Sequence, residues 1–459
     1  MHPPLGIYVH IPFCRHACAY CDFYFTLTAT RDAAIFIDAL INEAQARRYF
    51  FAALPSSLST DNKLPDHKLI KPRIKTLYLG GGTPSLLTAS LMEKLLTALK
   101  SIFSLTYLTE VTLEVNPEDI SEQKLRAWHH LGITRLSLGV QSFNSRHAKY
   151  LGRKIIPYPP QYWERVGALI RNIGFSELSL DLMYGFPSLS ISEWRSNLNS
   201  ALALGVDHIS LYSLTLEKNT RLHTQILKGS KPPLSEQQSL EHFLAAKDVL
   251  NRHGFIHYEI SNFAKPGHMA KHNQIYWTGG AYLGLGPSAH SYDGGRIRSS
   301  VASNLKQYLS VYSKNPSATT QSIDSIDSMT PMTAASISAK YSILIDKTVL
   351  TTKELYNDFI ITRLRSMLTG IALDEVEKLF SMTKREELLA RAKPLLAERL
   401  LALKTTDVIY KECAAAVPST DKRTIENPNS NSNRTNLRLV LTAQGSLVAD
   451  AVMRQLMDD

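Results

Sequence analysis

Three observations predict that this chain has an α/β fold with a parallel sheet. Short apolar runs of strand length alternate with longer amphipathic runs of helical period. Each such unit spans about thirty residues, the length at which crossover helices connect parallel strands. With 459 residues, of which 44% are hydrophobic, the chain is long enough for one large domain and a smaller one. On this pattern alone a barrel and an open doubly wound sheet are nearly indistinguishable.

The elements follow one another in a regular order along the first half of the chain. Six apolar runs are expected strands, at residues 6–11, 76–79, 110–115, 135–138, 177–181 and 208–212. Amphipathic runs between and after them are expected helices, at residues 33–51, 91–103, 122–131, 161–173, 192–204 and 236–253. Possible capping pairs mark three of the helix starts, namely Ser90 with Glu93, Ser190 with Glu193, and Ser235 with Gln238.

Four domains or segments are expected along the chain. Residues 1–225 would form the main α/β domain, residues 226–312 an extension of it, residues 313–336 a linker or disordered insertion, and residues 337–459 a small helical or winged-helix-like C-terminal domain. Residues 55–73, 313–336 and 417–436 are rich in Ser, Thr, Asn, Pro and Lys and are interpreted as surface loops or disorder. The C-terminal part carries helical patterns at residues 355–369, 373–380 and 441–456, with no site chemistry to assign.

Composition limits the compartment and the partners. No apolar run approaches the roughly 18 residues of a membrane span, and Pro3 and Pro4 stand where a signal peptide would have its apolar region. We therefore expect a cytoplasmic chain without a transmembrane segment, and peripheral membrane contact stays open. Lys plus Arg exceed Asp plus Glu by 51 to 41, which attracts anionic partners such as acidic proteins or lipid headgroups. The basic residues are too scattered for a nucleic-acid site.

Cysteine usage contains the strongest chemical signal. Of four cysteines, Cys14, Cys18 and Cys21 form a C-x3-C-x2-C loop directly after the first expected strand, while Cys413 is expected to be an ordinary thiol. Three thiolates are one too few for a closed metal site, and thiolates suit iron–sulfur clusters and zinc. A four-iron cluster would keep one iron open, whereas zinc would need His16 as a fourth ligand. An iron–sulfur cluster is the favoured interpretation, and zinc or three unrelated thiols are the alternatives.

Polar residues gather where the expected strands end. The run from Gly80 to Thr83 follows the second strand, and glycines there let a backbone approach a ligand closely or simply form a tight turn. Glu114, Gln141 and Asp181 come at the ends of the next strands. Each of these alone is as easily explained by a structural ion pair or cap. In a barrel, however, the ends of the strands are where a ligand binds.

The cysteine loop and the residues around it resemble the signature of the radical S-adenosylmethionine (SAM) superfamily. The wider phrase Tyr8-Val-His-Ile-Pro-Phe-Cys14 is similar to one branch, the oxygen-independent coproporphyrinogen III oxidases and the related HemW-type haem chaperones. The match covers roughly the first three hundred residues. It implies a partial (β/α)6 TIM-like barrel, a [4Fe-4S] cluster on the three cysteines, and SAM on the open iron, where an electron from the cluster would cleave SAM to a deoxyadenosyl radical.

The resemblance also implies roles for residues at the strand ends. Gly81, Gly82 and Thr83 correspond to the glycine motif that receives the methionine amino group of SAM. Glu114 and Asp181 correspond to partners of the ribose and adenosine hydroxyls.

Four further residues complete the implied cofactor site. Gln141 and Arg153 correspond to contacts with the ribose and the methionine carboxylate. Tyr8 and Tyr20 flank the cluster, either as packing aromatics or as cofactor contacts.

Two departures separate this chain from the coproporphyrinogen oxidases. Those enzymes carry an additional cysteine where this chain has Phe23, and a long segment before the Tyr8 position, where this chain has seven residues. In their place, residues 272–277 read H-N-x-x-Y-W, which resembles the motif of the haem-chaperone branch. His272 is thereby implied to help bind haem, since imidazole is a common haem ligand.

The sequence therefore predicts a radical-SAM-type haem chaperone that binds haem and passes it to acceptor proteins of unknown identity. The alternative is an oxygen-independent coproporphyrinogen III oxidase, and whether the chain is an enzyme stays open. A glycine-rich run from Gly284 to Ala289 imitates a dinucleotide fingerprint, but Pro287 stands where its helix would begin. That run is interpreted as a loop against the porphyrin or SAM site.

Overall fold

The computed structural model describes residues 5–27, 32–51, 73–153, 160–313, 344–409 and 437–458. Its centre is a sheet in which six strands run parallel and neighbour one another in chain order. These strands are β1 (Leu5–Ile11), β2 (Ile74–Gly81), β3 (Glu110–Val115), β4 (Arg135–Gln141), β5 (Glu177–Tyr184) and β6 (His208–Ser213). The predicted parallel α/β architecture is confirmed, and every predicted strand is present with its ends shifted by a few residues at most.

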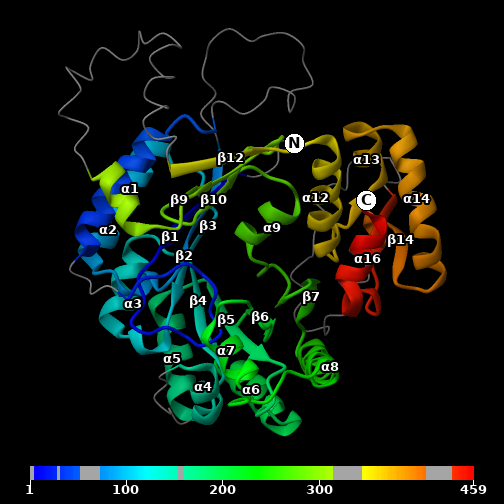
Figure 1. Cartoon of the computed structure of the whole chain (residues 1–459). Coiled ribbons are helices and arrows are strands. Elements are labelled where there is room, and N and C mark those ends of the chain that lie inside the picture. Colours follow the sequence, from blue (N-terminus) through cyan, green and yellow to red (C-terminus); the bar gives the residue numbers. More distant parts are fainter. Residues whose placement is uncertain are drawn as a thin grey trace, which may run out of the picture.

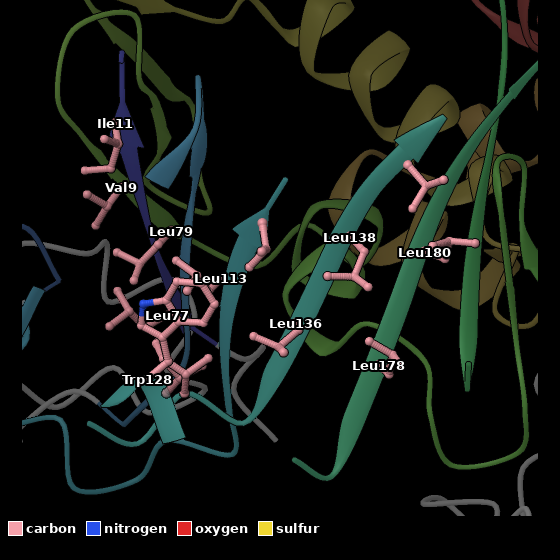
Figure 2. Packing of buried hydrophobic residues seen from close by; sticks show 14 of the residues in the cluster. Val9, Ile11, Leu77, Leu79, Leu113, Trp128, Leu136, Leu138, Leu178 and Leu180 are labelled. Atoms are coloured by element: carbon pink, nitrogen blue, oxygen red, sulfur yellow. The ribbon is translucent and has the colours of Figure 1, made fainter. Parts of the chain in front are cut away.

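Helices cover the outer face of this sheet (Figure 1). They are α1 (Ala33–Ala46), α2 (Ala89–Phe103), α3 (Glu122–His130), α5 (Pro160–Ile173), α6 (Ile191–Ala203) and α8 (Glu236–Arg252). Side chains alternate along a strand, so every second residue faces the helices. Leu136, Leu138, Leu178 and Leu180 are fully buried on that side, and Figure 2 shows them packed in one layer with the side chains of the neighbouring strands.

The other face of the six strands is polar. On β3 the inward positions are Glu110, Thr112 and Glu114, and on β4 they begin with Arg135 and Ser137. A half barrel whose concave side is lined with such groups must pair them or present them to a ligand, because a bare buried charge is costly. The interior of the partial barrel is thus where the site is expected.

Among the residues that the structure describes, the sheet continues at both edges and does not close on itself. Beside β1 lies the parallel strand β9 (Tyr282–Leu285), followed by β10 (His290–Tyr292), β11 (Ile297–Val301) and β12 (Ile345–Val349), all antiparallel. Beside β6 lie β8 (Asn262–Ala264) and β7 (Ile256–Glu259). Shorter helices α4 (Ser145–Leu151), α7 (Arg221–Leu227), α9 (Lys271–Trp277) and α10 (Leu305–Tyr312) lie between these elements.

Buried Glu43 of α1 connects the barrel to the strands and helix that follow α9. Its carboxylate accepts hydrogen bonds from the Gly286 backbone at 2.7 Å and from the Tyr308 hydroxyl at 2.7 Å, and it pairs with Arg47. Arg47 also donates to the Gly284 carbonyl. These bonds explain why α1 ends at Ala46 and does not reach residue 51 as predicted, because the chain turns there to bring Arg47 onto β9.

The C-terminal region has its own core and a three-stranded sheet. Its elements are α12 (Thr352–Arg365), β13 (Ile371–Ala372), α13 (Leu373–Leu379), α14 (Met382–Ala397), β14 (Leu401–Thr405), β15 (Leu437–Leu441) and α16 (Ala449–Leu456). The core gathers side chains such as Ile360, Val376, Leu388 and Leu439. Helix α14 was not predicted. A mostly helical appendage is confirmed, and Figure 1 shows it beside α9 and β7.

Other predictions have mixed outcomes. The predicted boundary between residues 225 and 226 falls inside α7, and the domain limits stay predictions. The predicted insertions, apart from end residues 73 and 313, lie outside the described residues, as does Cys413. None of the helices in the described ranges is long and apolar enough to cross a bilayer.

The predicted helix caps can be compared directly with the structure. Ser190 and Glu193 form the predicted capping box. Ser235 caps its helix, but the Gln238 side chain bonds the Leu189 carbonyl and does not reach back. The Ser90 pair is wrong, because α2 begins earlier and Thr88 caps it by accepting a hydrogen bond from the Leu91 backbone.

Candidate functional site

A cavity of about 340 Å³ lies at the C-terminal ends of the parallel strands, beneath the cysteine loop. Eleven of the thirteen predicted site residues line it, and they are Cys14, Cys18, Tyr20, Cys21, Gly81, Gly82, Thr83, Glu114, Gln141, Arg153 and Asp181. The other two, Tyr8 and His272, lie elsewhere. The position agrees with the rule that barrels bind ligands at the ends of their strands.

Backbone hydrogen bonds hold the cysteine loop over the cavity. The Cys14 N–H donates to the Thr26 carbonyl at 3.0 Å, and the Ala19 N–H donates to the Leu151 carbonyl at 2.9 Å. The Thr83 hydroxyl lies 3.6 Å from the Cys14 sulfur and donates to it. All three thiols are free and half-buried. Burial raises the pKa of Cys14 and raises that of Cys21 to about 12, so a metal centre would have to displace their protons.

The three cysteine sulfurs do not form a tight preformed site for a single metal ion. Among the residues that the structure describes, one trio of His, Cys, Asp or Glu ligand atoms lies within 4.8 Å of one another, and it is Glu177, Asp207 and His268. The cysteine sulfurs are thus spread more widely than that. Zinc–sulfur bonds of about 2.3 Å would draw them closer together. His16, the predicted fourth zinc ligand, also lines the cavity and is exposed.

Glycines at the end of β2 let the cysteine loop come close. An added Cβ on Gly82 would lie 2.7 Å from the Phe13 carbonyl oxygen and 2.9 Å from that of Ile11, and Gly81 has a φ of +106°. Both contacts of Gly82 are with backbone, which cannot move aside. Glycine is therefore required at position 82 to seat the loop, beyond any contact with a ligand.

Two carboxylates inside the cavity have raised pKa values. Burial raises the pKa of Glu114 to about 7, although the Tyr78 hydroxyl donates to it at 2.8 Å and the Gly81 N–H at 3.1 Å. Burial likewise raises the pKa of Asp181 to about 6, while the Ser137 hydroxyl donates to it at 3.4 Å. Each carboxylate keeps acceptor capacity toward the cavity, which suits ligand hydroxyl groups.

Arg153 provides a positive charge on the opposite wall. It donates to the Asn116 side chain at 3.1 Å and to Tyr20. Gln141 reaches the cavity from a left-handed backbone with φ of +66°, a conformation that costs a non-glycine residue about 1 to 3 kcal/mol and that is concentrated at functional sites.

Two residues of the site, Asn116 and Tyr78, were not predicted from the sequence. Asn116 directly follows β3, and Tyr78 occupies an inward position of β2, which were the available signals.

A second cavity, of about 500 Å³, lies on the other side of the cysteine loop. Asp22 and Phe23 line both cavities. The second cavity is strongly aromatic, and its lining includes Tyr8, Phe23, Tyr24, Tyr276, Trp277, Tyr282 and Tyr292, with Asp358 and Thr362 of α12. Tyr8 thus contacts this space and does not face the first cavity. The predicted loop at residues 284–289 also reaches it through Ser288.

The structure places His272 in the interior of the half barrel. Its side chain is 1% exposed. Its Nδ1 lies 2.8 Å from the Thr76 hydroxyl and its Nε2 lies 2.9 Å from the Tyr276 hydroxyl. Both ring nitrogens are therefore occupied, so iron binding through either nitrogen of His272 requires breaking the hydrogen bond that this nitrogen makes. Burial lowers the pKa of His272 to about 3, which keeps the ring neutral.

Helix α9, which carries His272, is held at its first turn by a buried carboxylate. Glu110 accepts hydrogen bonds from the backbone of Lys271 and of His272, each at 2.9 Å. Arg135 lies 3.6 Å from the same carboxylate and is itself 2% exposed. An acidic group at a helix N-terminus satisfies otherwise unpaired N–H groups and favours the helix dipole. This fixes where Tyr276 and Trp277 project.

Comparisons with known proteins agree with this arrangement. Residues 8–201 match the family model of the radical SAM superfamily. Heme chaperone HemW of Escherichia coli is 35% identical over 300 residues, covering 64% of this chain and 72% of that protein. Heme chaperone HemW of Lactococcus lactis is 34% identical over 292 residues, covering 64% and 70%.

This chain belongs to the HemW-type family of the radical SAM superfamily.

A solved structure shows the same fold as this HemW-type chain. Coproporphyrinogen III oxidase (HemN) from Escherichia coli covers 99% of the chain at a TM-score of 0.69, with 20% sequence identity and 90% of its own chain aligned. The likeness extends through the C-terminal appendage. Superfamily membership implies a [4Fe-4S] cluster and SAM, and the first cavity carries the donor set for both.

Proposed function

We propose that this chain binds haem and passes it to haem-requiring proteins, on a scaffold that retains an iron–sulfur cluster and a SAM site. The observation that carries the proposal is the second, aromatic cavity. Its volume of about 500 Å³ lies in the ~300 to 1,000 Å³ range of cofactor pockets. The relatives named Heme chaperone HemW support the choice of ligand.

The residues around the second cavity suit a flat, apolar ring with a polar edge. Tyr276 and Tyr282 meet edge to face at 4.7 Å between ring centroids, and Tyr282 lies 6.3 Å from Tyr292. Aromatic rings pack well against planar ligands. Arg298 lies over Tyr292 and pairs with Asp358 at the edge, where carboxylates of a porphyrin would meet charged groups.

In the first cavity, Cys14, Cys18 and Cys21 would hold the cluster. A cluster with one open iron supplies a binding point for the SAM amino and carboxylate groups and a source of one electron. Glu114 and Asp181 would accept hydrogen bonds from hydroxyl groups of the bound molecule, and Arg153 would face its carboxylate. The roles follow the family resemblance, and the geometry of the cavity supports them.

The haem part of the proposal is tested by titration. Protein reconstituted anaerobically with iron and sulfide should bind ferric protoporphyrin IX at one equivalent per chain, and the Cys14→Ala variant should lose the cluster. No saturable haem binding by the wild type would refute the proposal.

Transfer is tested by kinetics. The rate at which an apo-haemoprotein receives haem should rise with acceptor concentration if the haem is handed over directly. A rate that is independent of acceptor concentration would show release into solution and would refute the transfer step. SAM-dependent formation of protoporphyrinogen IX from coproporphyrinogen III would establish the oxidase instead.

A further inference from the structure

We propose that His290 is the side chain that binds the haem iron in the second cavity, and that His272 is a positioning residue. This inference rests on the proposed haem binding and names the iron ligand within it. It departs from the motif-based expectation, which assigned haem contact to His272.

The histidines near the second cavity differ in whether their ring nitrogens are available. His272 uses both nitrogens inside the barrel, as described above. His10 lines the cavity, but its Nδ1 lies 3.2 Å from the Tyr8 hydroxyl and its Nε2 lies 2.9 Å from the Tyr24 carbonyl oxygen. His290 also lines the cavity and is exposed, and no group in the described part of the chain hydrogen-bonds its ring. Iron needs a free imidazole nitrogen, and His290 offers one.

The alternation of side chains along β10 places His290 on the same face as aromatic residues that line the second cavity. Side chains alternate along β10, so His290 and Tyr292 share one face, while Ser291 is buried on the other. In the pairing with β11, Tyr292 stands opposite Arg298. In the pairing with β9, Tyr292 stands opposite Tyr282. One face of these three strands therefore presents the imidazole beside the rings that would contact a porphyrin.

The backbone that carries His290 is rigid. Ser291 is anchored on both sides, since its hydroxyl accepts from the Gly284 N–H at 2.9 Å and from Arg47 at 2.9 Å. An added Cβ on Gly284 would lie 2.1 Å from the His290 carbonyl oxygen, so β9 and β10 approach as closely as backbones can. A ligand side chain on a fixed strand holds a metal at a defined position.

His272 acts through its neighbours. Its Nε2 hydrogen bond fixes the Tyr276 hydroxyl, and its ring packs 5.2 Å from the Tyr78 ring. Replacing His272 would leave Tyr276 less firmly held in the lining of the second cavity. The proposed iron ligand, His290, would stay in place. Substitution of His290 and substitution of His272 are thus expected to affect haem binding in different ways.

The experiment compares His290→Ala, His272→Ala and the control His130→Ala, an exposed histidine on α3, in the full-length reconstituted protein. Ferric protoporphyrin IX is titrated, and the iron–histidine stretch of the ferrous complex is read by resonance Raman spectroscopy. We expect His290→Ala to lose the iron–histidine signature and to bind haem about tenfold or more weakly, since losing even a hydrogen-bond partner of a metal ligand costs about tenfold or more. Added imidazole should restore the signature, because the second cavity that His290 lines leaves room for it to reach the iron.

Each outcome decides between the assignments. His272→Ala should keep the iron–histidine signature, with weaker binding, and His130→Ala should match the wild type. A signature that persists in His290→Ala, or that disappears only in His272→Ala, would overturn the assignment while leaving haem binding intact. Absence of haem binding by the wild type would instead refute the proposed function. Iron and sulfide content equal to wild type shows that each variant is folded.

Discussion

Glu114→Gln should stabilise the cofactor-free protein above neutral pH and should do so in a pH-dependent way. The carboxyl group of Glu114 has a pKa of about 7 because it is buried, against 4.5 for an ordinary glutamate. Between these two values the folded state binds a proton that the unfolded state has lost. The free energy of unfolding therefore falls as pH rises from the unfolded pKa through the folded one, and it levels above that.

The size of the stabilisation follows from the difference between the folded and unfolded pKa values of Glu114. Each pKa unit corresponds to about 1.4 kcal/mol, so the rise in pKa from 4.5 to about 7 sets an upper limit of about 3.5 kcal/mol, and water in the cavity reduces this to about 1 to 3 kcal/mol. Glutamine is nearly isosteric, and its side-chain oxygen can still accept a hydrogen bond from Tyr78 or Gly81. The variant should thus remove the penalty of the charge with little loss of packing.

The assay is urea unfolding of the metal-free protein from about pH 4.5 to about pH 8.5, with the exposed Glu93→Gln as the matched control. Wild type and Glu114→Gln should have similar stability at the acid end and should diverge toward the alkaline end. SAM binding should weaken by roughly ten- to a hundred-fold in the same variant, since a hydrogen bond to a charged group is lost. A stability difference that does not change with pH would refute the reasoning.

Two further substitutions test the supports of the two cavities. Glu110→Gln should lower the free energy of unfolding by about 3 kcal/mol in urea titrations, because buried Arg135 loses a carboxylate partner and the first turn of α9 loses one of its two acceptor oxygens. Glu122→Gln, which breaks an exposed pair, should change it by less than about 0.5 kcal/mol, and equal effects would contradict the role of Glu110. Gly82→Ala should lower the iron and sulfide content after reconstitution, because its Cβ would strike the cysteine loop. Gly139→Ala, with its nearest contact at 3.4 Å, is the control, and equal iron content in both variants would contradict this account.

The strands that build the first cavity could be predicted because each carries a local signal. Leu136 and Leu138 alternate with Arg135 and Ser137, which is the pattern of a strand with one apolar and one polar face. Residues at the C-terminal ends of such strands lie close together whatever the conformation of the loops, since neighbouring parallel strands end at the same edge of the sheet. That is why Glu114, so distant in sequence from Cys14, could be placed in the same site.

The second cavity could not be predicted in the same way. Its walls come from β1, α9, the β9 to β11 strands and α12, whose approach depends on long-range pairing. Strand β9 lies beside β1 because Glu43, Arg47 and Gly284 connect α1 to it, and none of these residues carries a local signal of that contact. Short strands such as β10, with three residues, also lack a periodicity that could be recognised.

The contacts of His272 could not be predicted from the motif that contains it. The comparisons confirm the predicted family, but an imidazole can bind iron, fill a core or orient a neighbour with the same sequence around it. Its role depends on which groups reach its two nitrogens. Here Thr76 and Tyr276 occupy them, and Glu110 holds the helix so that they stay occupied. The polar inner face of the half barrel thus accounts for both findings. It leaves Glu114 open to a ligand at one end, and at the other it holds α9 so that both nitrogens of His272 stay hydrogen-bonded, which is why we propose that the iron ligand comes from strand β10.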